Sequence, residues 1–431
     1  MTDATQREQE RIKSVARLLH QGCRPLKVLS ALAWPPEVKT TFLDGGSQEL
    51  PRVSYPAFDP TPTIEAVREA RRLIVPVTTI DLWFDQQAQA IELAARMLAA
   101  AGTPAFFDHA RQLYGEPTAP LRYLPVTPIQ LAHTVQETIA QLAQIHFDLA
   151  PPAYHSATEV AKRLKVAVKE HFGDQAPSVD LVDQLSANAL ATSKAIRVRR
   201  DARFTDRDFI QLLHHEAHIH VATSINGKAQ TDLPILGDAH PGTTRTQEGL
   251  AVFAELVSGS IELDRLRRLA DRVITIQMAI DGADFLDVYR YYLEKTSQPD
   301  QSFESARRVF RGGVITGGAP FTKDVVYLTG LLSVNYFIRA CFAAGRADAI
   351  HLLFCGKLDL FAVPALCELY ALGLCRPPRF LPPWISDPRY LLATLTFSTF
   401  ANRHDLEPLV QVATKLLDSA PVVRMPANES P

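Results

Sequence analysis

The sequence predicts an α+β fold that is predominantly helical, with a small β-sheet beside a histidine-rich helix. Most of the chain spaces its apolar residues at helical intervals, whereas only two short stretches have the character of strands. The composition, 47% hydrophobic and 21% charged over 431 residues, is that of a globular protein with one or two domains. We expect residues 1–152 to form a mostly helical region that packs on a second domain of residues 153–431.

The N-terminal region divides into helices and proline-rich connectors. Ala90 to Ala101 and Pro128 to Leu149 have the composition and the apolar spacing of helices. Leu50 to Pro62 is dense in proline and is expected to be extended or looped. Ala150-Pro151-Pro152 is the expected linker to the second domain.

The second domain begins with a helix followed by two strands. Ala157 to Phe172 has the pattern of an amphipathic helix, and Val179 to Val182 that of a strand. In Ala195 to Arg199 apolar residues alternate with arginines, which is typical of a strand. We expect Ile196 to Arg199 to be the edge of the sheet, where an extended peptide would pair.

The histidine-rich helix has a clear start signal. Thr205 followed three residues later by an aspartate resembles a capping box, so the helix should begin at Asp206 and continue to about Thr223. Asn226-Gly227 then predicts a turn. Thr246 is expected to cap the next helix.

Four histidines surround one carboxylate between His214 and His220, a pattern typical of metal binding. His214 and His218 lie four residues apart and share a helix face, but Glu216 then points away from them. His215 and His220 are five residues apart, with Glu216 between them in projection. A π-type widening would bring these two imidazoles together. We therefore predict His215 and His220 as the pair, with a distorted turn between Glu216 and His220.

Catalytic zinc takes three protein ligands, and a carboxylate is a common third. Glu248 lies in an E-G-L-A stretch that is similar to the E-G-F-A of the zinc aminopeptidases, where the glutamate is that ligand. Gly249 would let the backbone pack close to a neighbouring helix and leave Glu248 room to reach the metal. Glu255, seven residues later, is expected either to orient a ligand histidine or to form an ordinary salt bridge.

Together these motifs resemble the QEGLA-motif family. Its bacterial members are labelled flavohaemoglobin expression-modulating proteins, and its animal relatives include the microtubule-associated tyrosine carboxypeptidases, which remove a C-terminal tyrosine from tubulin. The central match is T-Q-E-G-L-A at Thr246 to Ala251, preceded by H-E-x-x-x-H. Further matches are Leu113-Tyr114-Gly115, Asn226-Gly227 with Gln230, Arg308 to Gly312, Phe321 to Asp324 leading to Tyr327 and Gly330, and Leu381-Pro382-Pro383-Trp384.

The resemblance implies a zincin-like, gluzincin-type catalytic core in residues 153–431. It implies Zn²⁺ on His215, His220 and Glu248, with Glu216 as the general base of a carboxypeptidase-like reaction. The chain departs from the family pattern at His218, where a small residue such as glycine is expected. His218 is then either a group behind the ligands or a competing ligand. The tubulin substrate does not follow from these motifs.

Further roles remain open between catalytic and structural readings. Tyr327 or Lys323 would stabilise the oxyanion of the reaction, although both residue types at helical spacing are usually structural. Arg308 and Arg311 would hold the substrate carboxylate. The alternative is that these arginines pair with structural carboxylates such as Asp324. His240, in a Pro-Gly loop, is expected to be structural.

Two other functions fit the same residues. One is a non-hydrolytic regulatory or binding protein that uses the metal fold, although an intact Glu216 argues against it. The other is a metal-dependent hydrolase of a non-peptide substrate, which would need the same site.

Composition and segment character exclude several partners. Lys and Arg (45) nearly balance Asp and Glu (47), which gives no case for nucleic acid or an anionic membrane. The polar N-terminus argues against a secretory signal, and charged residues interrupt the apolar stretch from Val325 to Phe354, which predicts buried helices. Five cysteines without close pairing suit a cytoplasmic protein. The expected partner is a peptide or protein C-terminus, and the sequence indicates no oligomeric state.

Overall fold

The computed structural model describes residues 3–401 apart from 76, 123–124, 143–152, 184, 186–187 and 193, together with 403, 411–412 and 414–415. Within these residues the fold is mostly helical with two small sheets, which confirms the predicted α+β class. The expected linker, Ala150 to Pro152, lies outside the described residues.

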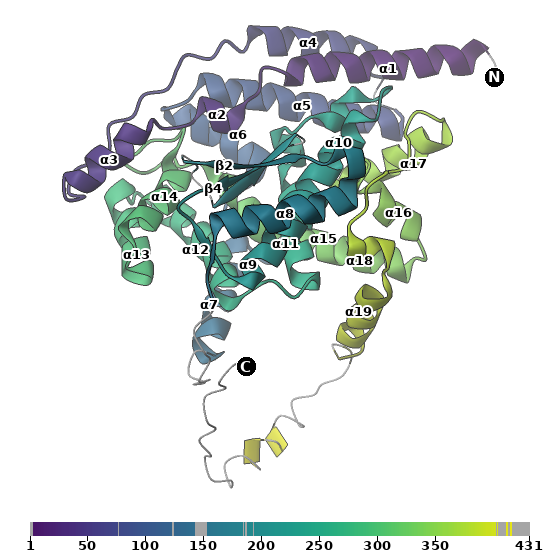
Figure 1. Ribbon diagram of the computed structural model, residues 1–431. Coiled ribbons are helices and arrows are strands. Elements are labelled where there is room, and N and C mark those ends of the chain that lie inside the picture. Colours follow the sequence, from purple (N-terminus) through teal and green to yellow (C-terminus); the bar gives the residue numbers. More distant parts are fainter. Residues whose placement is uncertain are drawn as a thin grey trace.

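Helices form most of the N-terminal region. They are α1 (Asp3–Cys23), α2 (Val28–Ala31), α3 (Pro36–Asp44), α4 (Thr61–Leu73), α5 (Thr79–Ala99), α6 (Pro104–Tyr114) and α7 (Pro128–Leu142). Figure 1 shows α1, α4 and α5 packed side by side along one side of the molecule. Residues 51–60 form neither helix nor strand, as their prolines predicted.

Five short strands follow, with α8 among them. In chain order the elements are β1 (His155–Ser156), α8 (Ala157–Phe172), the 3₁₀ turn η1 (Gly173–Gln175), β2 (Ser178–Val182), β3 (Ala189–Ala191), β4 (Ala195–Arg199) and β5 (Arg203–Phe204). The larger sheet has the order β2-β4-β3, with β4 parallel to β2 and antiparallel to β3. The prediction that Ile196 to Arg199 is an edge strand is therefore wrong, because both sides of β4 are already paired.

The rest of the chain is helical. Its elements are α9 (Asp206–Leu212), the π-helix η2 (Leu213–Val221), α10 (Ala222–Lys228), η3 (Pro234–Gly237), α11 (Pro241–Val257), α12 (Leu263–Ile280), α13 (Phe285–Thr296), α14 (Pro299–Phe310), η4 (Thr322–Val325), α15 (Val326–Ala343), α16 (Ala347–Leu352), η5 (Leu360–Ala362), α17 (Val363–Ala371), α18 (Pro383–Ser386) and α19 (Arg389–Ala401).

The largest hydrophobic core is shared by both parts of the chain. Phe84 from α5 and Leu250 from α11 are completely buried in the same cluster. A second cluster joins α8 and the sheet to the back of the histidine-rich helix through Leu164, Ile196 and Ala217. The two cores therefore fix the histidine-rich helix between the sheet and α11 (Figure 1).

One segment, Thr322–Ala343, is long and apolar enough to cross a membrane by length and composition alone. In this fold 56% of its apolar window is buried, and core helices of soluble proteins pass the same test. It packs on α11 so closely that a Cβ added at Gly249 would lie 2.4 Å from the carbonyl oxygen of Gly330. This confirms the predicted close approach at Gly249. The absence of a membrane span stays a prediction from the sequence.

Candidate metal centre

The histidine-rich helix starts as the sequence predicted. The Thr205 hydroxyl accepts a hydrogen bond from the Asp208 amide at 3.1 Å, and the Asp208 carboxylate accepts one from the Thr205 amide at 2.8 Å. After α9 the helix widens into η2, which spans all four histidines. The distorted turn between Glu216 and His220 is thus confirmed, and the rings of His215 and His220 lie 4.9 Å apart.

The same helix continues past its expected end. Asn226 and Gly227 lie inside α10, so the predicted turn at these residues is wrong. The Asn226 side chain donates to the carbonyl oxygens of Phe354 and Phe380 at 2.9 and 2.8 Å. Tertiary hydrogen bonds therefore satisfy the amide that would otherwise favour a local turn.

The helix that carries Glu248 begins earlier than predicted. It starts at Pro241, after His240 in the N-cap position, so the prediction of a cap at Thr246 is wrong. Proline suits the first helical position because its missing N–H has no intrahelical partner there. Thr246 instead accepts a hydrogen bond from the amide of Leu360 at 3.0 Å.

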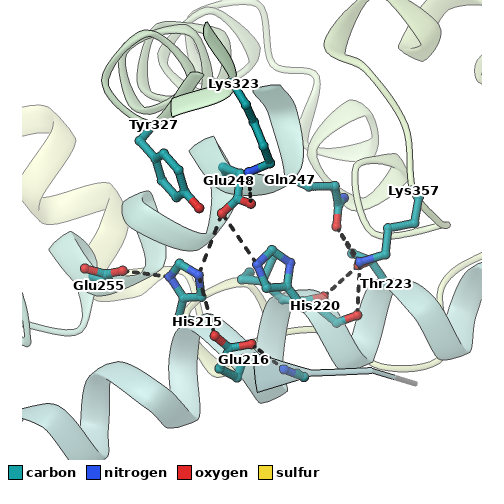
Figure 2. A network of polar contacts seen from close by, with 12 residues as sticks. His215, Glu216, His220, Thr223, Gln247, Glu248, Glu255, Lys323, Tyr327 and Lys357 are labelled. Atoms are coloured by element: carbon teal, nitrogen blue, oxygen red, sulfur yellow. Dashed lines mark hydrogen bonds and ion pairs between the residues drawn. The ribbon is translucent and has the colours of Figure 1, made fainter. Parts of the chain in front are cut away.

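The three predicted ligands converge on one point (Figure 2). Glu248 Oε2 lies 3.9 Å from His215 Nε2 and 3.8 Å from His220 Nε2, and all three ligand atoms fall within 4.8 Å of one another. Tetrahedral zinc with bonds of about 2.0–2.2 Å separates its ligand atoms by about 3.5 Å. The side chains keep 12% to 17% of their surface exposed, so a cation can reach them. The donor set therefore fits zinc.

A carboxylate behind the site orients His215. Glu255 Oε1 lies 2.7 Å from His215 Nδ1 and accepts a hydrogen bond from its N–H, which leaves Nε2 free to bind a cation. Arg265 holds the other side of Glu255 with two hydrogen bonds of 2.9 Å. Burial opposes this charge, yet Arg265 and His215 together keep the pKa of Glu255 well below its usual value. Both readings of Glu255 from the sequence hold at once.

Glu216 lies beside the three converging atoms and is anchored to the sheet. Its Oε2 accepts a hydrogen bond of 2.9 Å from the Ala191 amide of β3, and its Oε1 lies 3.9 Å from His215 Nε2. Burial raises the pKa of Glu216, as suits a group that exchanges protons. β3, rather than β4, is thus the edge of the sheet that borders the site.

Two candidate oxyanion donors, Lys323 and Tyr327, lie across the site from the histidine-rich helix (Figure 2). Lys323 Nζ lies 3.4 Å from Glu248 Oε1. Burial opposes the Glu248 charge, but Lys323 and the two site histidines lower the pKa of Glu248 to about 2. The Tyr327 hydroxyl accepts a 3.3 Å hydrogen bond from Arg308, so its own proton remains available for donation.

The two arginines predicted to hold a substrate carboxylate differ in their surroundings. Arg308 already binds the Asp324 carboxylate with two hydrogen bonds, of 2.6 and 3.0 Å, and keeps 26% of its side chain exposed. Arg311 is 8% exposed, and its guanidinium lies 5.8 Å from the Phe321 ring. The alternative pairing with Asp324 is therefore present for Arg308.

The other two histidines face away from this centre. His218 Nδ1 lies 3.4 Å from His214 Nδ1, and the His218 ring lies 4.5 Å from the ring of His171 on α8. Burial lowers the pKa of His218 to about 2. Neither histidine belongs to the group of converging ligand atoms.

Two buried cations near the centre were missed by the sequence reading. Arg265 holds Glu255, and Lys357 donates to the carbonyl of His220 at 3.2 Å. Both lie far from the histidine motif in sequence. Glu255, near the end of its helix, could have prompted a search for a cationic partner. No pattern in the sequence around Lys357 indicates that this residue contacts the site.

Comparison with known proteins agrees with the resemblance seen in the motifs. A family model described as microtubule-associated tyrosine carboxypeptidase matches residues 40–403, most of the chain. A search of curated proteins finds no match. The matched range includes both ligand-bearing helices, the sheet and α15. The chain therefore belongs to the microtubule-associated tyrosine carboxypeptidase family.

Proposed function

We propose that the protein is a zinc-dependent, carboxypeptidase-like metallopeptidase with a gluzincin-type, zincin-like core. The observation that carries this proposal is the convergence of His215, His220 and Glu248 within 4.8 Å, with Glu216 beside them. Family membership supports a peptidase acting at C-termini. The substrate is a peptide or protein C-terminus.

Zinc bound to these ligands would polarise the scissile carbonyl and activate a water molecule. Glu216 would take the proton from that water and pass it to the leaving amine. The Ala191 amide holds one oxygen of Glu216 and leaves the other directed towards the site. Glu255 keeps His215 in the tautomer that can bind the metal.

Tyr327 is the better candidate for the oxyanion donor. Its hydroxyl points into the site and accepts a hydrogen bond from Arg308. The hydroxyl proton is therefore directed away from Arg308 and can be donated to an oxyanion. Lys323 contacts Glu248 and would instead balance the charge of that ligand. Of the two arginines, Arg308 is the more exposed and is our candidate for contact with the terminal carboxylate, whereas Arg311 would contribute positive potential from behind.

A cytoplasmic location accords with the state of the cysteines. All five are free, and all except Cys367 are buried. Buried free thiols are at home in a reducing compartment.

The proposal is tested by measuring zinc content and hydrolysis together. The purified protein should bind one zinc ion per chain and release C-terminal residues from a panel of peptides with varied ends. Glu216→Gln should keep the zinc and lose about 10²–10⁴-fold in turnover, the usual contribution of a general base. A wild-type protein that binds no zinc, or a fully active variant, would overturn the proposal.

A further inference from the structure

Lys357 is a buried cation whose ammonium faces the metal helix. It follows α16 in the chain and is 8% exposed. Its Nζ donates to the carbonyl of His220 at 3.2 Å and to Gln247 Oε1 at 3.0 Å (Figure 2). Lysine is rarely buried without a charged partner, yet both hydrogen-bond acceptors here are neutral. The ammonium is held by these two acceptors, and the charges of the nearby Glu248 and Glu216 carboxylates favour its protonated form against burial.

The two acceptors belong to the two elements that carry the candidate ligands. His220 is a ligand on η2, and Gln247 immediately precedes the ligand Glu248 on α11. Thr223 closes the network, because its hydroxyl lies 2.9 Å from Gln247 Oε1 and 2.7 Å from the carbonyl oxygen of Ile219. One lysine thus connects both sources of ligands.

This network of hydrogen bonds holds the C-terminal end of the π-helix η2. A π-helix is rare, appears mostly as a single turn within an α-helix, and is frequent at functional sites. The carbonyls of Ile219 and His220, near the end of η2, both accept hydrogen bonds from side chains. Fixing the His220 carbonyl fixes its peptide plane, and with it the direction in which the His220 imidazole leaves the helix.

Close backbone packing places Lys357 itself. Its amide donates to the carbonyl of Leu236 at 2.7 Å. A Cβ added at Gly356 would lie 2.4 Å from that same oxygen, and one added at Gly227 of α10 would lie 2.2 Å from it. Three segments therefore meet where only glycine fits, and the base of the lysine side chain is held against the metal helix.

We propose that Lys357 is a positioning residue of the metal centre, which acts with Gln247 and Thr223 to hold His220 and Glu248 at the spacing a metal requires. The proposal rests on the proposed zinc site and assigns a role to the glutamine of the Q-E-G-L-A stretch. Lys357 is not one of the three candidate ligands; it acts through the His220 carbonyl and the Gln247 side chain.

The first test is the zinc affinity of Lys357→Met, measured by competition with a chelator. Methionine keeps an unbranched stem but removes the donor, so zinc should bind about 10–100-fold more weakly, as for other groups behind metal ligands. Unchanged affinity would overturn the positioning role. A wild-type protein that fails to bind zinc would instead overturn the proposed function, so the two failures are distinct.

The second test uses Thr223 and separates hydrogen bonding from packing. Thr223→Val keeps the shape without the hydroxyl, and Thr223→Ser keeps the hydroxyl without the methyl group. We expect Val to weaken zinc binding about tenfold and Ser to leave it near wild type. The reverse order would show that packing alone matters. These variants decide the question even if Lys357→Met does not fold.

A matched control lies on α12. Thr275 is also completely buried, and its hydroxyl bonds to the Asp271 carbonyl at 2.8 Å and to the Tyr292 hydroxyl at 3.0 Å. Thr275→Val should lower thermal stability and leave zinc affinity unchanged. An equal loss of zinc affinity in Thr275→Val and Thr223→Val would mean that general destabilisation is responsible, and the proposal would fail.

Discussion

The two sides of the histidine-rich helix carry the same residue type in very different surroundings. His215 faces three glutamates, Glu216, Glu248 and Glu255. Burial opposes its protonation, but these carboxylates outweigh burial and raise the pKa of His215. His218, three residues later in the same helix, packs on His171 and makes no ion pair within the described part of the chain.

The difference shows that a histidine cluster does not by itself make a metal site. Neutral imidazoles supply lone pairs on both sides, but among the described residues only the side with Glu248 gathers three potential ligand atoms within 4.8 Å. Glu248 supplies one of the three converging atoms. Glu255 fixes the tautomer of His215. The side of His218 instead adjoins the second hydrophobic core, whose members include Ala217 of η2 and Phe172 of α8.

Exchanging one histidine on each side should give the largest effect. His220→Gln removes a ligand, so zinc binding should weaken by more than the roughly 10–100-fold expected for a group behind the ligands. His214→Gln, the same change on the opposite side, should retain zinc. Zinc content after dialysis and peptide hydrolysis would be measured for both. Loss of zinc from both variants to the same extent would show that the two sides share one function.

His240 extends the comparison to a histidine without carboxylates on another helix. It is 4% exposed, and neither ring nitrogen has a hydrogen-bond partner within the described residues. Burial lowers the pKa of His240 to about 4. Because the unfolded chain then binds the proton more readily, stability is complete above the usual histidine value of 6.5 and falls as the pH drops towards 4.

The expected loss from this one group is about 3 kcal/mol between neutral pH and pH 4. Denaturant unfolding at pH 7.5 and pH 4 would measure it, with His240→Leu as the variant that cannot titrate. The difference in stability between the two pH values should be smaller in His240→Leu than in the wild type. Equal pH dependence would show that folding does not shift the pKa of His240.

Sequence patterns predicted the parts of the site that depend on neighbours along the chain. The capping box at Thr205 and the widened turn before His220 are set within a few residues of the motifs, and Gly249 marks a close approach although its partner, Gly330, is distant in sequence. Each follows from helix geometry or from the space that a side chain occupies. The sequence also predicted which three ligands would converge, and the structure brings them together.

Two of the wrong predictions involve a partner distant in sequence, and the third involves an ambiguous local pattern. Asn226 and Gly227 were predicted to form a turn because the local sequence does not reveal the hydrogen bonds from the Asn226 side chain to the carbonyls of Phe354 and Phe380. The alternation in β4 indicates a strand but does not reveal how many strands pair with it. The helix of Glu248 starts at Pro241, which a Pro-Gly pair in sequence also marks as a loop.

The last prediction concerns the carboxylate that distinguishes the two sides most directly. Glu255→Gln keeps the shape and one acceptor for His215 but removes the charge. Nε2 of His215 then becomes a weaker donor to the metal, and zinc affinity should fall about 10–100-fold. Arg265 would also lose its charged partner, so the variant should be less stable as well.

The double variant Glu255→Gln with Arg265→Met separates these two consequences. Removing both charges takes away the unpaired buried cation, so much of the stability should return. Zinc affinity should stay low, because the charge behind His215 is still missing. If the affinity recovered together with the stability, Glu255 would serve only as a structural partner of Arg265. The feature that makes His215 different from His218 would then be its closeness to Glu248, and the hydrogen bond that Glu255 accepts from His215 would have no effect on metal binding.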